Sequence, residues 1–253
     1  MTDVRITSAA KALPEFARLT SEILPFVPLW LHGEPDRLIR KAVKIFEGAG
    51  VDRRYGIMDA EAVFTATSFE DRNRVYAREV KKLGEEVLAK ALAKASWDGD
   101  SLDYLITVSC TGIMIPSLDA YLINALSLRG DICRLPVTEM GCAAGISGLI
   151  YACHFLRANP GKRAAVIAVE SPAATFQYTD HSMANIISAA IFGDGASCVL
   201  MSSEPETDGP RILEQGMYHF PDTTHLMGFD LTNSGLKMIL DPAVPETISD
   251  HFY

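Results

Sequence analysis

The segment Met140-Gly141-Cys142-Ala143-Ala144-Gly145 decides how this chain can fold. An apolar run from Ile132 to Val137 precedes it and is typical of a β-strand. The small and apolar residues from Ile146 to Leu156 follow it and are typical of a buried helix. A cysteine at such a junction lies at a helix N-terminus, where free N–H groups and the helix dipole favour a thiolate. The thiolate is the nucleophilic form of cysteine, so Cys142 is the first candidate for covalent chemistry.

Two interpretations of Cys142 are open from these residues alone. Its small neighbours, Gly141 and Ala143 among them, would let a substrate approach the backbone, whose N–H groups could hold an oxyanion. A structural cysteine, buried where a helix meets a sheet, would have the same neighbours. The remaining cysteines are predicted to be mainly small core residues: Cys110, Cys133, Cys153 and Cys198.

Strands and helices alternate outward from this segment. The predicted strands are 102–109, 132–138, 163–169, 196–202 and 211–217, and the predicted helices are 37–46, 70–96, 118–128, 142–158 and 183–191. Ser68 and Asp71 form an acidic variant of the capping box ahead of the long helix. Strands separated by helices of this length predict right-handed βαβ crossovers and a mostly parallel, buried sheet.

Two further patterns could belong to a site. Phe192-Gly193-Asp194-Gly195 is typical of a tight turn in which Asp194 bonds the backbone, and Phe192 before it could project into a pocket. Arg37, Lys41 and Lys44 share one helix face, which could receive a phosphorylated cofactor or could simply be a solvated face.

Composition narrows the possible functions. The 253 residues are 48% apolar and 22% charged, an ordinary globular composition. A net charge of −9 argues against general nucleic-acid binding, and no apolar run reaches the roughly 20 residues of a membrane helix. The spacing of the cysteines favours neither a zinc site nor a disulfide framework. Free thiols, with no signal-peptide core in Met1 to Ala12, predict a cytoplasmic location.

The chain resembles the chalcone-synthase-like, or type III, polyketide synthases from about Ile6 to Ser249. The resemblance rests on motifs in this order: Val108-Ser109-Cys110-Thr111-Gly112 with Pro116, Gly141-Cys142-Ala143-Ala144-Gly145, Glu170 to Phe176, Phe192-Gly193-Asp194-Gly195-Ala196, and Gly235-Leu236-Lys237-Met238 leading to Asp241 and Pro245. Ketoacyl-ACP synthases carry a similar cysteine and a similar turn, so one motif alone would not be specific.

The resemblance implies an α/β fold of the thiolase-like, layered αβαβα type, and a homodimer. It places a complete N-terminal half in residues 1–209 and a truncated start of the C-terminal half in residues 210–253. Members of the family load an acyl group from a CoA thioester onto the cysteine and extend it with malonyl-CoA by decarboxylative condensation. They often cyclise the product, here to a pyrone or phenol, and need no metal or redox cofactor.

The resemblance also implies roles for particular residues. Cys142 is the acyl-accepting nucleophile, and Phe192 is a gatekeeper aromatic between the CoA tunnel and the cavity. Met238 stands where many members have a second gatekeeper phenylalanine. Ile115 is expected at the dimer interface, and Arg37 and Lys41 near the CoA phosphates. Thr111, Thr175 and Ser188 are expected to line the cavity.

The chain departs from the family pattern in its catalytic residues, and this leaves several interpretations of its function open. The general-base histidine and the oxyanion-stabilising asparagine of the family are expected beyond Tyr253, and no histidine of this chain is assigned to either role. The chain is therefore predicted to be the N-terminal portion of a synthase, or to be completed by another polypeptide. The alternatives are a ketoacyl-ACP synthase III-like condensing enzyme and a non-catalytic fragment that needs a complementary chain.

Overall fold

The chain divides into two compact units in a computed structural model that describes residues 2–65 and 67–251. The first unit comprises Met1–Leu13, Ala77–Glu170 and Gly195–Tyr218, and the second comprises Pro14–Tyr76, Ser171–Asp194 and His219–Tyr253. This division differs from the thiolase-like halves expected at residue 209, which stay a prediction. The last residues of the expected range 210–253, Phe252 and Tyr253, lie outside the described residues.

The first unit is built on a sheet with the strand order β1-β7-β6-β4-β5. Its strands are β1 (Arg5–Ala12), β4 (Tyr104–Val108), β5 (Cys133–Val137), β6 (Arg163–Glu170) and β7 (Gly195–Ser202). Strand β4 pairs in parallel with both β5 and β6, whereas β7 pairs antiparallel with both β6 and β1. The expected βαβ crossovers are therefore present on one side of β6 only.

The expectation of a mostly parallel sheet is wrong at β7. Glu170, the last residue of β6, lies opposite Gly195, the first residue of β7. The chain thus leaves and re-enters the sheet at the same end, and a strand that returns from that end must run antiparallel. A helix over 183–191 is present as predicted. It belongs to the segment Ser171–Asp194, which is part of the second unit, and does not form a crossover between parallel strands.

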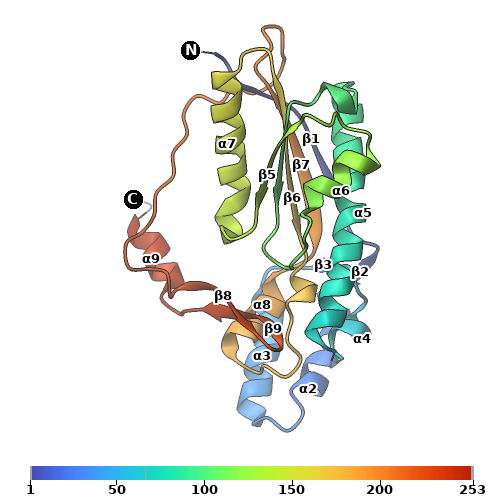
Figure 1. Cartoon of the computed structure of the whole chain (residues 1–253). Helices are drawn as coiled ribbons and strands as arrows, with labels where there is room; N and C mark the ends of the chain where they lie inside the picture. Colours follow the sequence, from blue (N-terminus) through green and yellow to red (C-terminus); the bar gives the residue numbers. More distant parts are fainter. Residues whose placement is uncertain (1, 66, 252–253) are drawn as a thin grey trace. The chain divides into compact units, whose positions relative to one another are not determined.

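Helices cover both faces of this sheet, α7 (Ala144–Ala158) on one face and α5 (Phe69–Ala95) with α6 (Leu118–Ala125) on the other (Figure 1). The core on the α7 side includes Ile106, Val166 and Leu156, which are 0–4% exposed. Gly148 lets α7 come close to the sheet, because a Cβ there would lie 2.8 Å from Val166 Cγ1. On the other face, Ser8 Oγ of β1 donates to Ala91 O of α5.

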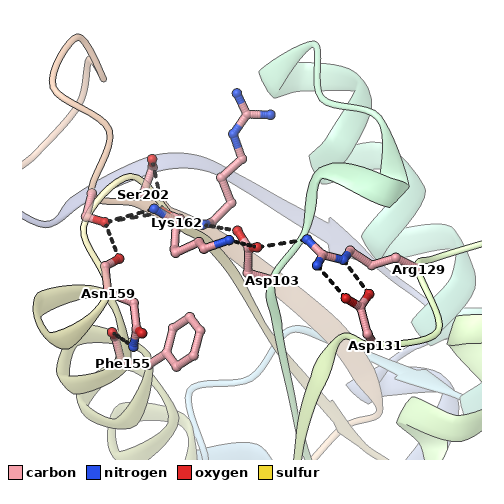
Figure 2. A network of polar contacts seen from close by, with 9 residues as sticks. Asp103, Arg129, Asp131, Phe155, Asn159, Lys162 and Ser202 are labelled. Carbon is pink, nitrogen blue, oxygen red and sulfur yellow. Dashed lines mark hydrogen bonds and ion pairs between the residues drawn. The ribbon is translucent and has the colours of Figure 1, made fainter.

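A polar network ties the amino ends of the parallel strands together (Figure 2). Asp103, just before β4, accepts from Arg129 Nη1 at 3.0 Å, from Lys162 Nζ at 2.8 Å and from the backbone N–H of Arg163 at 3.0 Å. Arg129 also pairs with Asp131, and this pairing lowers the pKa of Asp131 to about 2. Ligands of open α/β sheets bind at the opposite, carboxyl ends of the strands, so this network stabilises the sheet.

The second unit contains short elements from three parts of the chain. Its elements are β2 (Phe16–Leu19), α1 (Thr20–Ile23), α2 (Phe26–Trp30), α3 (Asp36–Gly48), β3 (Arg53–Gly56), α4 (Ala60–Val63), the 3₁₀ turn η3 (Pro172–Ala174), α8 (Met183–Ile191), β8 (Met227–Thr232), β9 (Gly235–Leu240) and α9 (Val244–His251). Strands β2 and β3 pair antiparallel, as do β8 and β9. Aromatic rings fill its core, with Trp30 and Phe176 centred 4.9 Å apart and Phe64 and Phe176 5.3 Å apart.

Apart from the strand over 211–217, the predicted strands and helices are confirmed, and their ends lie within three residues of the predicted ones. Helix α5 begins where the sequence predicts it, and Ser68 Oγ accepts from the N–H of Asp71 at 3.0 Å. The strand predicted over 211–217 is wrong: Arg211 makes only an isolated bridge to Arg5, and Leu213 is 68% exposed. A single bridge beside the start of β1 is too short to form a strand.

No helix in residues 2–65 and 67–251 combines the length and the apolarity needed to cross a bilayer.

Candidate functional site

Cys142 lies in a 3₁₀ turn, η2 (Gly141–Ala143), that joins β5 to the first residue of α7. Gly141 has φ +56°, a left-handed conformation that glycine adopts without steric cost. The turn therefore presents the cysteine at the start of a helix, as the sequence predicts. The Cys142 side chain is exposed, which contradicts the interpretation of a buried structural cysteine.

The carboxyl ends of β4, β5 and β6 bring other polar groups to this edge of the sheet. Glu170, at the end of β6, accepts from the N–H of Cys110 at 3.0 Å and from Thr111 Oγ1 at 2.6 Å. Thr111 is 5% exposed, and its hydroxyl makes this bond in the interior of the unit. The carboxylate of Glu170 therefore holds the loop after β4 against β6, on the edge where Cys142 follows β5.

The cysteines of the first unit differ in their surroundings. Burial, the Glu170 carboxylate and the neighbouring Cys142 raise the pKa of Cys110 to about 12. Burial raises the pKa of Cys153 and of Cys198, both of which are core residues as predicted. Cys133 is exposed, so its prediction as a core residue is wrong; it faces outward at the start of β5. A thiol with a raised pKa stays protonated near neutral pH, so Cys110 and the core thiols are poor nucleophiles.

The second unit contains a cavity of about 110 Å³, measured as the volume open to the centre of a water molecule. Its walls are mostly apolar and include Phe46, Phe64 and Phe176. Four residues predicted to belong to the site line this same cavity: Thr175, Ser188, Phe192 and Met238. The structure therefore brings together Ser188 of α8, Met238 of β9, and the residues that directly follow η3 and α8, Thr175 and Phe192.

Two polar side chains of the cavity wall each have a hydrogen-bonding atom that is unpaired among the described residues. Ser188 Oγ and Arg54 Nε are buried and have no hydrogen-bond partner there. The Arg54 guanidinium donates from Nη1 to Thr20 Oγ1 at 2.5 Å and from Nη2 to Ala190 O, and it lies over the Phe46 ring. Burial lowers the pKa of Arg54. Ligands of this cavity would be expected to carry hydrogen-bond acceptors.

Asp194 follows Phe192 in the turn between α8 and β7 and is 5% exposed. Its Oδ2 accepts from the N–H of Ile57 at 2.8 Å and from Ser171 Oγ at 3.0 Å, and its Oδ1 accepts from the N–H of Ala173 at 3.0 Å. The predicted role of Asp194 as a backbone-bonding turn residue is confirmed. Burial raises its pKa to about 6, against the lowering effect of these hydrogen bonds.

This raised pKa predicts a pH-dependent stability. A carboxyl group that binds its proton more tightly in the folded protein stabilises it fully below the reference pKa of 3.8, and this contribution is lost as the pH rises through about 6. A shift of roughly 2 units corresponds to about 3 kcal/mol. Urea denaturation between pH 4 and 7 should show the wild-type advantage over Asp194→Asn shrinking by that order as the pH rises. A constant difference between the two proteins would contradict the assignment.

The remaining predicted residues lie outside the cavity wall. Arg37 and Lys41 are exposed on α3, whose opposite face buries Ala42 and Phe46. Ile115, on the loop between β4 and α6, is 91% exposed. The structure thus confirms that Arg37, Lys41 and Lys44 share an exposed helix face, and it leaves their ligand undecided.

Arg54 is a site residue that sequence reasoning did not single out, and Glu170 entered only as the first residue of the motif Glu170 to Phe176, without a role of its own. Arg53 and Arg54 are neighbours in β3, and only Arg54 is buried, because successive side chains of a strand point to opposite faces. From sequence alone, an arginine in a short strand is predicted to be a surface residue. Glu170 ends an apolar strand, and a charged residue in that position is a local signal for its role.

Comparisons with known proteins agree with this geometry. Residues 55–205 match the family model described as chalcone and stilbene synthases, N-terminal domain. The 1,3,6,8-tetrahydroxynaphthalene synthase of Streptomyces griseus is 30% identical over 239 residues, which are 94% of this chain and 63% of the relative. The phloroglucinol synthase of Pseudomonas fluorescens is 29% identical over 220 residues, 87% of this chain and 63% of the relative.

Solved structures agree as well. The crystal structure of the tetrahydroxynaphthalene synthase from Streptomyces coelicolor, a bacterial type III polyketide synthase, matches with a TM-score of 0.92 and 30% identity, covering 97% of this chain and 70% of that one. Germicidin synthase from the same species has a TM-score of 0.91 at 22% identity and shows the fold alone. The mixed α/β architecture is thus the thiolase-like fold of these proteins, as the sequence predicts.

The chain spans 63%, 55% and 63% of the length of the first three curated relatives it matches. Two of these relatives are named 1,3,6,8-tetrahydroxynaphthalene synthase and the third phloroglucinol synthase, and the family model covers more than half of the present chain. On this evidence the chain belongs to the chalcone and stilbene synthase family.

Proposed function

We propose that this chain carries the acyl-loading cysteine and the acyl cavity of a type III polyketide synthase. The observation that carries the proposal is the exposed thiol of Cys142 in the turn between β5 and α7, in a member of this family. A thiol there is accessible to a thioester and lies at the positive end of a helix dipole. Ordinary core cysteines such as Cys153 have neither property.

The reaction proceeds in two steps. Sγ of Cys142 attacks the carbonyl carbon of an acyl-CoA, a new thioester forms, and the CoA thiolate leaves and takes up a proton. Malonyl-CoA then loses CO₂, and the resulting carbanion attacks the thioester carbonyl. A carbon–carbon bond forms and the Cys142 thiolate leaves, so no oxidant or reductant is consumed. Repeated extension followed by cyclisation would give a pyrone or phenolic product.

The cavity of the second unit is proposed to receive the acyl chain. Phe192 acts as the gatekeeper, Met238 stands in place of a second aromatic gate, and Thr175 and Ser188 contact the chain from the wall. Support comes from their shared position around one mostly apolar cavity. An apolar gate of this kind excludes water from a carbanion that water would protonate. Thr111, on the sheet edge near Cys142, is proposed as a further lining residue.

The partners follow from exposed residues of both units. Arg37 and Lys41 are proposed to bind the phosphates of CoA, since both are exposed on one face of α3. Ile115 is proposed to contact a second copy of the chain, because a side chain that is 91% exposed and apolar gains free energy when it is covered. A cytoplasmic location is proposed on the ground of the five unpaired cysteines.

A general base and an oxyanion donor are proposed to come from residues beyond this chain. The longer relatives have room for these groups in the part that this chain does not cover.

Comparing thioester donors tests the proposed function. The protein is incubated with malonyl-CoA and with malonyl-ACP after priming with a labelled acyl-CoA, and the peptides and products are analysed by mass spectrometry. We expect acylation of Cys142 by the CoA thioester. Strict dependence on the carrier protein would favour a ketoacyl-ACP synthase III-like enzyme, and no label on well-folded protein would favour a non-catalytic fragment.

Restoring an aromatic gate tests the role of Met238. Phenylalanine is bulkier and stiffer than methionine, so Met238→Phe should narrow the cavity beside Phe192 and shift the products toward fewer extensions. Met238→Leu, which nearly conserves volume, should leave the distribution unchanged. Liquid chromatography with mass spectrometry of the products measures the shift, and identical products from both variants would remove Met238 from the gate.

A further inference from the structure

Three segments of the second unit converge on the side chain of Asp194. They are the end of β3 with the residues that follow it, which include Ile57; the η3 turn, which includes Ala173; and the turn after α8, which carries Asp194 itself. The backbone of Asp194 also bonds the first segment, because its N–H donates to Tyr55 O at 2.9 Å. Ser171 Oγ completes the set of donors to the carboxylate.

These same segments form one continuous part of the cavity wall. Tyr55, Gly56 and Met58 line it from the first segment, Pro172, Ala173 and Thr175 from the second, and Phe192, Gly193 and Asp194 from the third. The N–H of Phe192 donates to Ser188 O at 3.0 Å, so its backbone is joined to α8 on one side and to the Asp194 turn on the other. The position of the Phe192 ring relative to Thr175 therefore depends on what Asp194 holds.

We propose that Asp194 is a positioning residue. Its carboxylate sets the separation between the gatekeeper Phe192 and the η3 turn, which Thr175 directly follows, and so sets which acyl chains the cavity accepts. This inference rests on the proposed role of the cavity in acyl binding. It assigns chain selectivity to a buried side chain that need not touch the substrate.

A carboxylate is the only side chain of this size that satisfies all of the donors. Both of its oxygens accept, Oδ1 from Ala173 and Oδ2 from Ile57 and Ser171. Asparagine has one acceptor oxygen, and its NH₂ group would face a backbone N–H on the other side. Because the site is buried, that donor–donor conflict cannot be relieved by water, and the segments must move apart.

A structural role alone would lower stability and leave selectivity unchanged, so the test separates the two. Asp194→Asn removes one acceptor, and Ser171→Ala removes one donor and keeps the carboxylate. Asp119→Asn is the matched control, since Asp119 is a fully buried carboxylate of the first unit that accepts from Ser117 Oγ and Arg134 Nε. For each protein, KM and the maximal rate for acylation of Cys142 are measured with acyl-CoA starters of increasing chain length, together with the thermal midpoint.

The expected result is a change of KM that depends on chain length. Asp194→Asn should change the KM ratio between long and short starters by about tenfold or more, as expected for a lost hydrogen bond to a buried charge. Ser171→Ala should change it in the same direction by a smaller factor, and it decides the question if Asp194→Asn does not fold. Asp119→Asn should lower the thermal midpoint with the KM ratio unchanged. Unchanged ratios in both cavity variants would overturn the proposal.

A readout without turnover keeps this test independent of the proposed enzyme activity. Protein labelled with 4-fluorophenylalanine gives ¹⁹F resonances for its phenylalanines, and Phe192→Leu identifies the resonance of Phe192. That resonance should shift or broaden in Asp194→Asn and Ser171→Ala and stay in place in Asp119→Asn. Failure of wild-type acylation with this pattern intact would reject the enzyme and keep the positioning role, whereas an unmoved Phe192 resonance would reject the positioning role itself.

Discussion

Cys142→Ala is expected to abolish covalent acyl loading. Wild-type protein should carry about one acyl group per chain on this residue after incubation with a labelled acyl-CoA, and the variant none. Condensation should fall by about a thousandfold or more, because removal of a nucleophile removes the covalent path altogether. The physical reason is the position of the thiol, exposed between β5 and α7. Intact mass and peptide mapping measure the label.

Two other cysteines serve as matched controls for this prediction. Cys133→Ala removes another exposed thiol of the same unit, and Cys110→Ala removes the thiol whose pKa is raised to about 12 on the same sheet edge. Label on Cys142 should persist in Cys133→Ala, because exposure without the helix-start position does not activate a thiol. Undiminished label on Cys142→Ala protein, at Cys110 or Cys133, would refute the assignment of the nucleophile.

Gly148→Val should cause a large loss of stability, because α7 packs closely on the sheet at this position. Even a Cβ at Gly148 would lie 2.8 Å from Val166 Cγ1, 3.5 Å from Val108 Cγ2 and 3.6 Å from Ile106 Cγ2. Helix α7 would have to move off the sheet, and overpacking of this kind costs about 3 kcal/mol. Urea denaturation followed by circular dichroism measures the free energy of unfolding.

The control for Gly148 stands one turn earlier in the same helix. A Cβ at Gly145 would meet no heavy atom within 4 Å, so Gly145→Ala should be neutral or stabilising by up to about 1 kcal/mol through helix propensity. Gly148→Ala should be destabilising, by less than Gly148→Val. Equal effects of alanine at both positions would show that α7 can move freely on the sheet, and the close-packing argument would then be wrong.

The helices of the first unit were predictable because their signals are local. Ser68 and Asp71 mark the start of α5, and Asn159, Pro160 and Gly161 mark the end of α7. The direction of β7 was not predictable in this way. A periodic pattern identifies a strand, but the end at which the chain re-enters a sheet depends on everything between Glu170 and Gly195.

In the candidate site, too, local features were predictable from the sequence and long-range contacts were not. Cys142 could be found from the sequence because a nucleophile at a strand–helix junction is a local arrangement of small residues. Its exposure could not, since a buried cysteine would have the same neighbours. Likewise, Asp194 is recognisable as a turn residue, but its bonds to Ile57 and Ala173 join positions 137 and 21 residues away.

The sequence by itself determined the family, the alternation of the central strands and helices along the chain, and the candidate for the reactive cysteine. Each of these depends on periodicity or on motifs a few residues long. Only the tertiary structure decided that Thr175, Ser188, Phe192 and Met238 surround one cavity, and that Arg54 is buried while Arg53 is not. Long-range packing places residues by the shape of the whole unit, and no short stretch of sequence contains that information.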